Sequence, residues 1–333
     1  MRLMQLDELQ ERLVPFMRTN LEDPFAKVVA AEMAPGHAGF AYLFDVQSEG
    51  RLLRYWMRLP PPDVKLEGTA DVLRQVSVLD ALDGTDVPHC SVKWSGADPQ
   101  WFGRPYFVVE RIEGDVFRGE WIEKLPETTR NEFARQAMAA LAGVHKVDKA
   151  KCGYLGDFWG FEFDVTRWDR FYERAADQHL LALQPRVRQL LLDNIPADTN
   201  IGIYHGDYQY GNMMSSWEGK LLALIDWELC GIGATLNDVG WICAFNDADA
   251  WVHRVVTGLM PGADELEAMY TEAWGADPGN IRWFKALAVY KFGIITGFNL
   301  MLHRRGKRHD PLWEETALSM QSNMEYALKM LTG

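Results

Sequence analysis

The pattern of apolar residues changes about a third of the way along this 333-residue chain, and the change limits the folds open to it. Before the E-G-D-V turn at Glu113–Val116, strand-like segments are interleaved with helical ones. Beyond the turn, apolar residues recur mainly at helical spacings. A chain of this length is too long for one small core. The sequence therefore predicts an α+β fold of two lobes, an antiparallel sheet with a helix over residues 1–112 and a mainly helical lobe over 113–333.

The first lobe combines helical segments with strands. Leu6, Leu9, Leu13 and Phe16 recur at spacings of three and four, which is typical of a helix. Two apolar, aromatic-rich strands separated by Q-S-E-G and ended by three consecutive prolines predict a hairpin. The predicted elements are, in order, a helix over residues 1–30, strands at 40–46 and 51–59, a helix at 69–82 and a strand at 105–112.

The helical pattern of the second lobe is interrupted at one place. Helical periodicity marks residues 131–145, residues 187–195 and the region from about 237 onward. Residues 200–226 instead hold two short apolar segments around a polar loop, which indicates short strands.

Composition narrows the classes of partner. Acidic residues outnumber basic ones by 47 to 34, a formal net charge of −13. Such a charge argues against nucleic acid, whose phosphates bind basic surfaces. It fits a neutral or cationic small molecule, and it fits equally well a solvated acidic surface.

Nothing in the apolar segments predicts a membrane protein. The N-terminus lacks the apolar core of a signal peptide. The apolar stretch at 286–302 is interrupted by Lys291 and Asn299 and predicts a buried helix rather than a membrane span. Four scattered cysteines without a C-x-x-C pair indicate reduced thiols. We expect a cytoplasmic protein without a membrane partner.

One group of polar residues suggests a catalytic site. The loop H-G-D-Y-Q-Y-G-N places Asp207 five residues before Asn212, and Asp226 follows the apolar run L-L-A-L-I. Two short strands between Asn212 and Asp226 would turn the chain back, so that all three side chains face one cleft. Asp207 could accept a proton from a hydroxyl, while oxygens of Asn212 and Asp226 suit Mg²⁺. This division of work is that of kinase-type phosphoryl transfer.

The two motifs together resemble the aminoglycoside phosphotransferase and choline kinase-like family, which has a protein-kinase-like bilobal fold. H-G-D-x-x-x-x-N followed by I-D-W-E carries most of the resemblance. Further similar segments are C-G-I-G-A-T-L-N-D-V-G, G-R-P-Y-F-V-V-E-R-I-E-G and L-A-G-V-H-K-V-D, so that the resemblance covers roughly residues 30 to 310. The strand end M-R-L-P-P-P resembles the branch often appended to acyl-CoA dehydrogenases.

The resemblance implies roles for the large-lobe loop. Asp207 would be the catalytic base, and His205 would complete the catalytic pair by bracing the loop through hydrogen bonds. Asn212 and Asp226 would be the Mg²⁺ ligands. Asp238 would be a second structural acid, and we favour for it a role as a helix N-terminal cap. His145, on the apolar face of a helix, is expected to be a satisfied core histidine.

The resemblance also implies a nucleotide site in the small lobe. Arg58 would grip the α- and β-phosphates. The backbone of Glu110 to Ile112 would hold the purine, with Val109 behind it. The loop P-G-H-A-G-F-A, with Gly36 and Gly39, would cover the phosphates.

Two positions depart from the family pattern. Gln75 stands where the family usually has a glutamate that pairs with the basic group of the strand, and it could hydrogen-bond Arg58 without neutralising its charge. The loop at Gly36 and Gly39 also lacks the family's polar pair.

The first hypothesis is a Mg²⁺-dependent phosphotransferase that moves the γ-phosphate of ATP or GTP to the hydroxyl of a small molecule. The alternative, motivated by Gln75 and the atypical loop, is a catalytically weak or silent nucleotide- or ligand-binding module of the same fold. A protein kinase fits less well, because no activation segment ending in A-P-E is present.

The acceptor stays open at this level. Aminoglycosides, macrolides, choline-like amines, sugars and hydroxyacyl thioesters all fit. The aromatic residues of the late helices are expected to be mostly core, namely Trp241, Phe245, Trp283, Tyr290, Phe298 and Trp313. The resemblance implies that these helices also wall the acceptor site, so two or three of the aromatic residues would line it and favour an amine or a ring-bearing acceptor.

Overall fold

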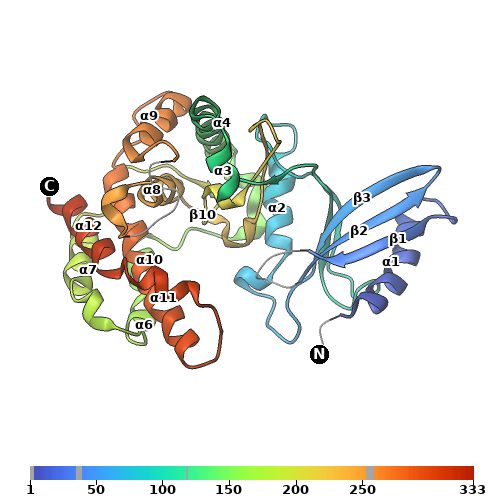
Figure 1. Cartoon of the computed structure of the whole chain (residues 1–333), viewed down its shortest axis with the longest axis horizontal. Helices are drawn as coiled ribbons and strands as arrows, with labels where there is room; N and C mark the ends of the chain where they lie inside the picture. Colours follow the sequence, from blue (N-terminus) through green and yellow to red (C-terminus); the bar gives the residue numbers. More distant parts are fainter. Residues whose placement is uncertain (1–3, 35–39, 118, 253–258) are drawn as a thin grey trace.

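The computed structural model describes residues 4–34, 40–117, 119–252 and 259–333. The described residues form a small lobe built on a sheet and a larger, mainly helical lobe beside it (Figure 1). The predicted α+β architecture is therefore confirmed.

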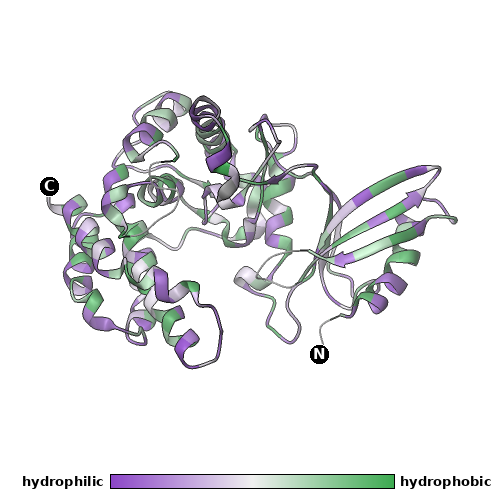
Figure 2. Ribbon diagram, in the orientation of Figure 1, coloured by the Kyte–Doolittle hydropathy of each residue, from purple (hydrophilic) through white to green (hydrophobic). Residues whose placement is uncertain are grey.

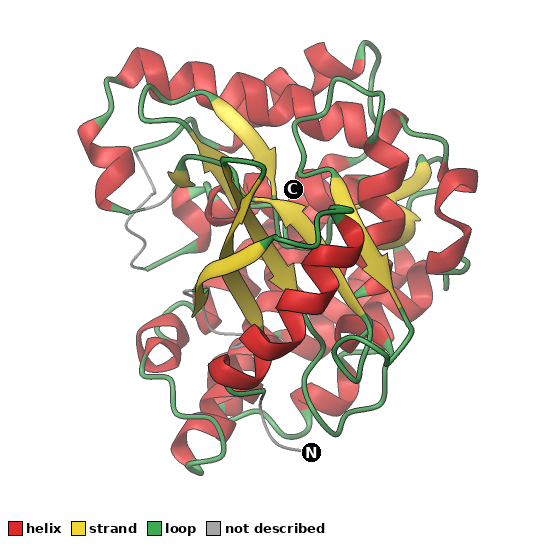
Figure 3. Ribbon diagram, turned by 90° about the vertical axis from the view of Figure 1, so that its right-hand side faces the viewer, coloured by secondary structure: helices red, strands yellow, loops and turns green. Residues whose placement is uncertain are grey.

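The small lobe is an antiparallel sheet in the order β1-β2-β3-β5-β4. Its described strands are β1 (Lys27–Met33), β2 (Ala41–Ser48), β3 (Arg51–Arg58), β4 (Val92–Gly96) and β5 (Tyr106–Glu110). The predicted hairpin is confirmed by the pairing of β2 with β3, and its turn is made by Glu49 and Gly50, both at positive φ. Helix α1 (Leu6–Asn20) crosses one face of the sheet, as Figure 3 shows from the small-lobe side.

The prediction of a helix over residues 1–30 is wrong beyond Asn20. The chain there turns and forms β1, whose sequence K-V-V-A-A-E-M has no strong strand signal. Among the described strands, β1 lies at the edge of the sheet and pairs with β2 alone, so pairing between strands rather than local propensity decides its conformation. β4 was not predicted either, and it pairs with the apolar strand β5.

Strand β5 contributes side chains alternately to two hydrophobic cores, one on each face of the sheet. Tyr106 and Val108 lie in the core under α1, whereas Phe107 and Val109 lie in the core shared with α2 (Leu73–Leu82) and the large lobe. Successive side chains of a strand point to opposite faces, so one short strand joins both lobes.

The large lobe surrounds helix α10 (Ile281–Arg304). Helices α8 (Leu236–Phe245) and α12 (Met320–Thr332) pack against α10. Both hydrophilic and hydrophobic residues occur along the large-lobe helices (Figure 2). A Cβ on Gly240 of α8 would lie 2.4 Å from the backbone carbon of Phe284, so the glycine permits the close approach of α8 to α10. The described helices are α3 (Glu120–Lys124), α4 (Glu127–Lys146), α5 (Phe161–Thr166), α6 (Asp169–Tyr172), α7 (Gln184–Asp193), α8 (Leu236–Phe245), α9 (Ala263–Trp274), α10, α11 (Leu312–Ala317) and α12 (Met320–Thr332).

Short strands and 3₁₀ turns frame the polar loop. The strands are β6 (Asp115–Val116), β7 (Ile201–Tyr204), β8 (Met213–Ser215), β9 (Leu221–Leu224) and β10 (Gly231–Ala234). The 3₁₀ turns are η1 (Gly68–Ala70), η2 (Lys149–Leu155), η3 (Gln178–Leu181), η4 (Tyr210–Asn212), η5 (Trp227–Leu229) and η6 (Ala248–Ala250). Since β6 pairs with β8, the chain has joined the larger lobe by Asp115. The domain division at 112/113 stays a prediction.

Helix α10 is the one described helix that is long and apolar enough to cross a membrane by length and composition. It is longer than the apolar stretch suggested, because it begins at Ile281 and continues to Arg304. However, 67% of its most apolar window is buried inside the protein. The prediction of a buried helix is thus confirmed.

Candidate active site

A β-hairpin assembles the polar loop and the second carboxylate. β8 pairs antiparallel with β9, and the Ile225 N–H donates to the Asn212 carbonyl oxygen at 3.0 Å. The predicted return of the chain is thereby confirmed. Asp226 follows in the left-handed conformation at φ 63°, which an aspartate tolerates better than most residues. The hairpin thus returns Asp226 to the loop that carries Asp207 and Asn212.

The carboxylate of Asp207 is held by three neighbouring side chains. Gln209 Nε2 lies 3.0 Å from both carboxylate oxygens, and Asn212 Nδ2 donates to Oδ2 at 2.9 Å. The indole Nε1 of Trp241 donates to Oδ1 at 3.0 Å. These donors fix the orientation of a half-buried carboxylate, and an acceptor hydroxyl would take the place of one of the Gln209 contacts.

Asn212 and Asp226 offer oxygen atoms to a cation. The amide nitrogen of Asn212 is engaged by the backbone and side-chain oxygens of Asp207, both at 2.9 Å, which leaves its Oδ1 as the atom for a ligand. Asp226 is an exposed residue. The protein around it raises the pKa of its carboxyl by desolvation, and the charge of Asp207 adds to this, while Arg58 and His205 oppose it.

These two residues fit a Mg²⁺ ion that is bound largely through substrate. Among the residues that the structure describes, no group of three or more His, Cys, Asp or Glu side chains could hold a metal by itself. Mg²⁺ commonly takes one or two protein oxygens and completes its octahedron with waters and phosphates. The negative charges that crowd Asp226 would be relieved by such a cation.

His205 holds the loop in place through hydrogen bonds and a ring contact. Its Nδ1 accepts the Asp207 N–H at 3.3 Å, so Nε2 carries the proton that is donated to the Ile225 carbonyl at 2.9 Å. The ring also packs on the buried Trp227, with centroids 4.5 Å apart. Its neighbour Gly206 is at φ +91°, and a Cβ there would lie 2.3 Å from the carbonyl oxygen of Leu229. The loop therefore depends on glycine at this position.

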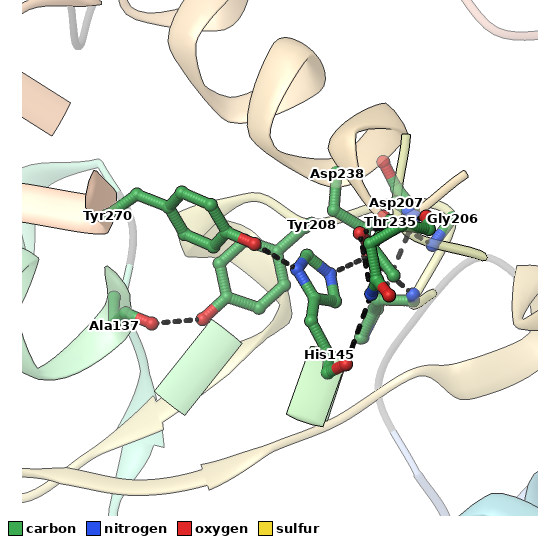
Figure 4. Close-up of polar contacts among 10 residues, drawn as sticks. Ala137, His145, Gly206, Asp207, Tyr208, Thr235, Asp238 and Tyr270 are labelled. Carbon is green, nitrogen blue, oxygen red and sulfur yellow. Dashed lines mark hydrogen bonds and ion pairs between the residues drawn. The ribbon is translucent and has the colours of Figure 1, made fainter. Parts of the chain in front are cut away.

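Asp238 ties the loop to two helices (Figure 4). Its carboxylate accepts the backbone N–H groups of His205 at 2.6 Å and Gly206 at 2.8 Å, and it contacts His145 Nε2 at 3.2 Å. His145 Nδ1 in turn lies 2.8 Å from the hydroxyl of Tyr270. Burial alone would raise the pKa of Asp238, but the hydrogen bond and electrostatic interaction with His145, followed by those with His205, lower it.

Two predictions about these core residues have different outcomes. His145 is a satisfied core histidine, as predicted. Asp238 has a structural role, but the predicted capping role is wrong. Thr235 occupies the N-cap of α8, and Asp238 lies in the first turn with its side chain directed at the loop.

A tyrosine gives the loop a further anchor. The hydroxyl of the buried Tyr208 donates to the Ala137 carbonyl at 2.6 Å, within helix α4 (Figure 4). The loop is thus fixed to α4 through Tyr208 and to α8 through Asp238.

Arg58 ends β3 and reaches across to the large lobe. Its Nη2 donates to Oε2 of Glu228 at 2.9 Å. Gln75 is buried on α2, and the hydrogen bond expected between Gln75 and Arg58 is not among the contacts of the described residues. The carboxylate that pairs with Arg58 thus comes from η5, two residues after Asp226.

The expected purine site lies on β5 and just beyond it. Val109 is buried, and Glu110, at the end of the strand, is exposed and pairs with Lys93 at 2.8 Å. The chain then leaves the sheet before Ile112. Gly36 and Gly39 lie outside the described residues. The nucleotide-binding roles of these residues stay predictions.

Sequence reasoning missed several contacts of this site. Trp241 was counted among aromatics that are mostly core, and neither Gln209 nor Glu228 was given a role. One signal in the sequence could have located Trp241. It lies three residues after Asp238, and residues three apart in a helix share a face, so both side chains could have been placed on the face of α8 that contacts the loop.

A buried lysine lies behind Trp241. Lys291 Nζ is 5.4 Å from the centroid of the Trp241 ring and 3.5 Å from Oδ1 of Asn237. Burial lowers the pKa of Lys291 to about 8, Asp164 and Asp238 oppose this change, and Arg167 adds to it.

Comparison with solved structures shows the same architecture. A structure from Ralstonia eutropha JMP134, assigned to the aminoglycoside phosphotransferases, has a TM-score of 0.77 at 22% identity and is aligned over 96% of this chain and 98% of its own. The GDP complex of wild-type aminoglycoside 2'-phosphotransferase-IIIa has a TM-score of 0.64 at 12% identity, over 97% and 98%. A ternary complex of an APH(4)-Ia mutant with ADP and hygromycin B has a TM-score of 0.62 at 13% identity, over 96% and 99%.

Curated relatives are longer proteins. "Probable acyl-CoA dehydrogenase IBR3" of Arabidopsis thaliana is 29% identical over 227 residues, which are 64% of this chain and 27% of that protein. Human "Acyl-CoA dehydrogenase family member 11" is 26% identical over 257 residues, 73% of this chain and 33% of that protein. The chain thus spans a third or less of the length of these relatives.

The family model described as "Phosphotransferase enzyme family" matches residues 35–284. The sheet-based small lobe, the helical large lobe and the aminoglycoside phosphotransferase neighbours agree with this match. This chain belongs to the phosphotransferase enzyme family and has its protein-kinase-like bilobal fold.

Proposed function

We propose that the chain transfers the γ-phosphoryl group of ATP or GTP to a hydroxyl group of a small molecule, with Mg²⁺. The observation that carries the proposal is the carboxylate of Asp207, which three side chains orient close to Asn212 and to the carboxylate of Asp226. Family membership supports the transfer of a phosphoryl group, and the acceptor and cation are our inference.

Each residue has a distinct part in the proposed reaction. Asp207 accepts a hydrogen bond from the acceptor hydroxyl, orients its oxygen toward the γ-phosphorus and takes its proton as the new O–P bond forms. The bond between the γ-phosphorus and the β–γ bridging oxygen breaks in the same step, and the nucleoside diphosphate leaves. Arg58 offers N–H groups to phosphate oxygens. Asn212 and Asp226 would hold Mg²⁺, which would neutralise charge on the phosphates. Catalysis then rests chiefly on positioning and electrostatics.

Neighbouring structures support a nucleotide and a hydroxyl-bearing acceptor. These structures are complexes with GDP, ADP or AMP-PNP, and some of them also contain hygromycin B or kanamycin. In this chain, Trp241 stands beside Asp207 and stacks on Phe245, whose ring centroid is 4.7 Å away. Trp241 and Phe245 are largely buried, and Trp283 and Tyr290 are fully buried, so all four rings belong to the core. The proposal of a ring-bearing or amine-bearing acceptor therefore rests on the ligands of the neighbouring enzymes.

The silent-module alternative rests on the neutral Gln75. The pair between Arg58 and Glu228 weakens that argument, because the arginine has a carboxylate partner from another element. A cytoplasmic location, and the lack of nucleic-acid and membrane partners, stay predictions from composition.

The test combines nucleotide binding with transfer. Calorimetry with ATP and GTP, each with and without Mg²⁺, is expected to show Mg²⁺-dependent binding of at least one nucleotide. The preferred nucleotide, labelled at the γ-phosphate, is then offered with a panel of hydroxyl acceptors to the wild type and to Asp207→Asn. We expect the variant to bind nucleotide normally and to lose about 10²- to 10⁴-fold in transfer rate. Undiminished transfer by the variant would show that Asp207 is not the base, and wild-type protein that binds no nucleotide at millimolar concentration would favour the silent module.

A further inference from the structure

We infer that Glu228 is a positioning residue for the nucleotide, which orients Arg58 toward the phosphates from the opposite lobe. The inference rests on the proposed nucleotide site. Arg58 and Glu228 are 170 residues apart, yet their side chains meet at 2.9 Å between Nη2 and Oε2. The arginine side chain is 14% exposed and the glutamate side chain 33%, so the pair is shielded from solvent.

Both ends of this pair stand on fixed backbone. Arg58 is the last residue of β3 and is paired in register with Phe107 of β5. Glu228 belongs to η5, whose first residue, Trp227, is fully buried and donates its indole N–H to the Leu224 carbonyl at 3.2 Å. A guanidinium between two rigid anchors loses little further conformational entropy when a ligand binds.

The contact leaves most of the guanidinium available. Glu228 engages Nη2, and an arginine has five N–H donors in a planar fork. The remaining donors can take phosphate oxygens, for which this fork is well suited. Asp226, the proposed metal ligand, lies two residues before Glu228, so Arg58 pairs with the turn that directly follows this ligand.

The pair is one of several links between the lobes. Arg74 of α2 donates through Nη2 to the Cys230 carbonyl at 3.0 Å and through Nη1 to the Leu155 carbonyl at 3.3 Å. These bonds hold α2 against the segment that follows η5. Loss of the Glu228 carboxylate should therefore disturb the orientation of Arg58 without separating the lobes.

The experiment is a double-mutant cycle read by nucleotide binding. Calorimetric titrations of ATP and GTP with Mg²⁺ are made on the wild type, Glu228→Gln, Arg58→Met and the double variant. We expect Glu228→Gln to raise the nucleotide dissociation constant roughly tenfold, which is within the range of coupling seen between contacting side chains. In a protein that already carries Arg58→Met, the same change should have no further effect on the dissociation constant. In transfer assays, KM for nucleotide should rise in Glu228→Gln while kcat changes less. Glu113→Gln is the matched control, because Arg54, also on β3, pairs with Glu113 on the surface.

The possible results separate the inference from the proposed function. Wild-type binding of nucleotide that Glu228→Gln leaves unchanged would overturn the inference alone. A loss that persists in the Arg58→Met background, or that disappears at high Mg²⁺, would show that Glu228 acts on the cation instead, and the inference would be wrong. A large fall in melting temperature with unchanged affinity would show a merely structural pair. Failure of the wild type to bind any nucleotide would remove the proposed function together with the inference.

Discussion

Trp241 donates its indole N–H to Oδ1 of Asp207 at 3.0 Å, so a core helix holds the carboxylate proposed to be the catalytic base. The same ring packs between Phe245 and Phe292 and has Lys291 on its face. The orientation of Asp207 thus depends on the packing of α8 and α10.

Trp241→Phe should reduce turnover more than binding. Phenylalanine keeps much of the ring packing but lacks the N–H, so Asp207 loses one of the donors that orient it. We expect kcat to fall about tenfold, as for the loss of one hydrogen bond, with the nucleotide dissociation constant unchanged. Trp251→Phe is the control, because that indole donates to the Ala244 carbonyl and not to the loop. Equal kcat values for the two variants would contradict the role of Trp241.

Asp226→Asn should remove the Mg²⁺-dependent part of nucleotide affinity. Asparagine tolerates the left-handed backbone at this position as aspartate does, so the change isolates the charge. We expect calorimetry to give similar weak affinities with and without Mg²⁺, whereas the wild type gains affinity when the cation is added. If the variant still gains affinity with Mg²⁺ as the wild type does, Asp226 is not a ligand.

Asp238→Asn should lower the free energy of unfolding by about 3 kcal/mol at pH 7, since a buried acceptor of several N–H groups loses its charge. The pKa of Asp238 is lowered by folding, so its ionisation stabilises the protein above the ordinary value of 3.8, and this stability is lost as the pH falls through the folded value. Urea unfolding should therefore show a difference between variant and wild type that narrows in acid. Asp249→Asn, at an exposed pair with Lys329, serves as the control with little expected effect. A constant difference from pH 7 to pH 3 would refute this account.

Lys291→Met should raise the melting temperature at pH 7. Burial lowers the pKa of Lys291 from 10.5 to about 8, so near neutral pH the protein keeps a charge that folding disfavours. Above pH 8 the folded state releases this proton before the unfolded state does, so wild-type stability recovers relative to the variant up to about pH 10.5. Thermal unfolding of both proteins between pH 7 and pH 10 measures the difference. A variant less stable than the wild type at pH 7 would show that the contacts with Asn237 and Trp241 outweigh the burial of the charge.

Local pattern predicted the elements whose stability is mainly local. The β2–β3 hairpin and helix α4 appear where period-two and helical spacings placed them. Strand β1 was missed, because its alanine-rich sequence becomes a strand only by pairing with β2. Spacing also predicted that Asp226 returns to the loop of Asp207 and Asn212, and the short β8–β9 hairpin makes that return.

The sequence by itself determined the lobe types, the polar loop and the family, because these depend on periodicity and on motifs within short stretches of chain. Only the tertiary structure decided which groups hold that loop. Trp241 reaches Asp207 across 34 residues, Asp238 reaches Gly206 across 32, and Glu228 reaches Arg58 across 170. Such contacts follow from the packing of α8 on α10 and of one lobe on the other, and no local spacing encodes a distance between elements that are brought together by a shared core.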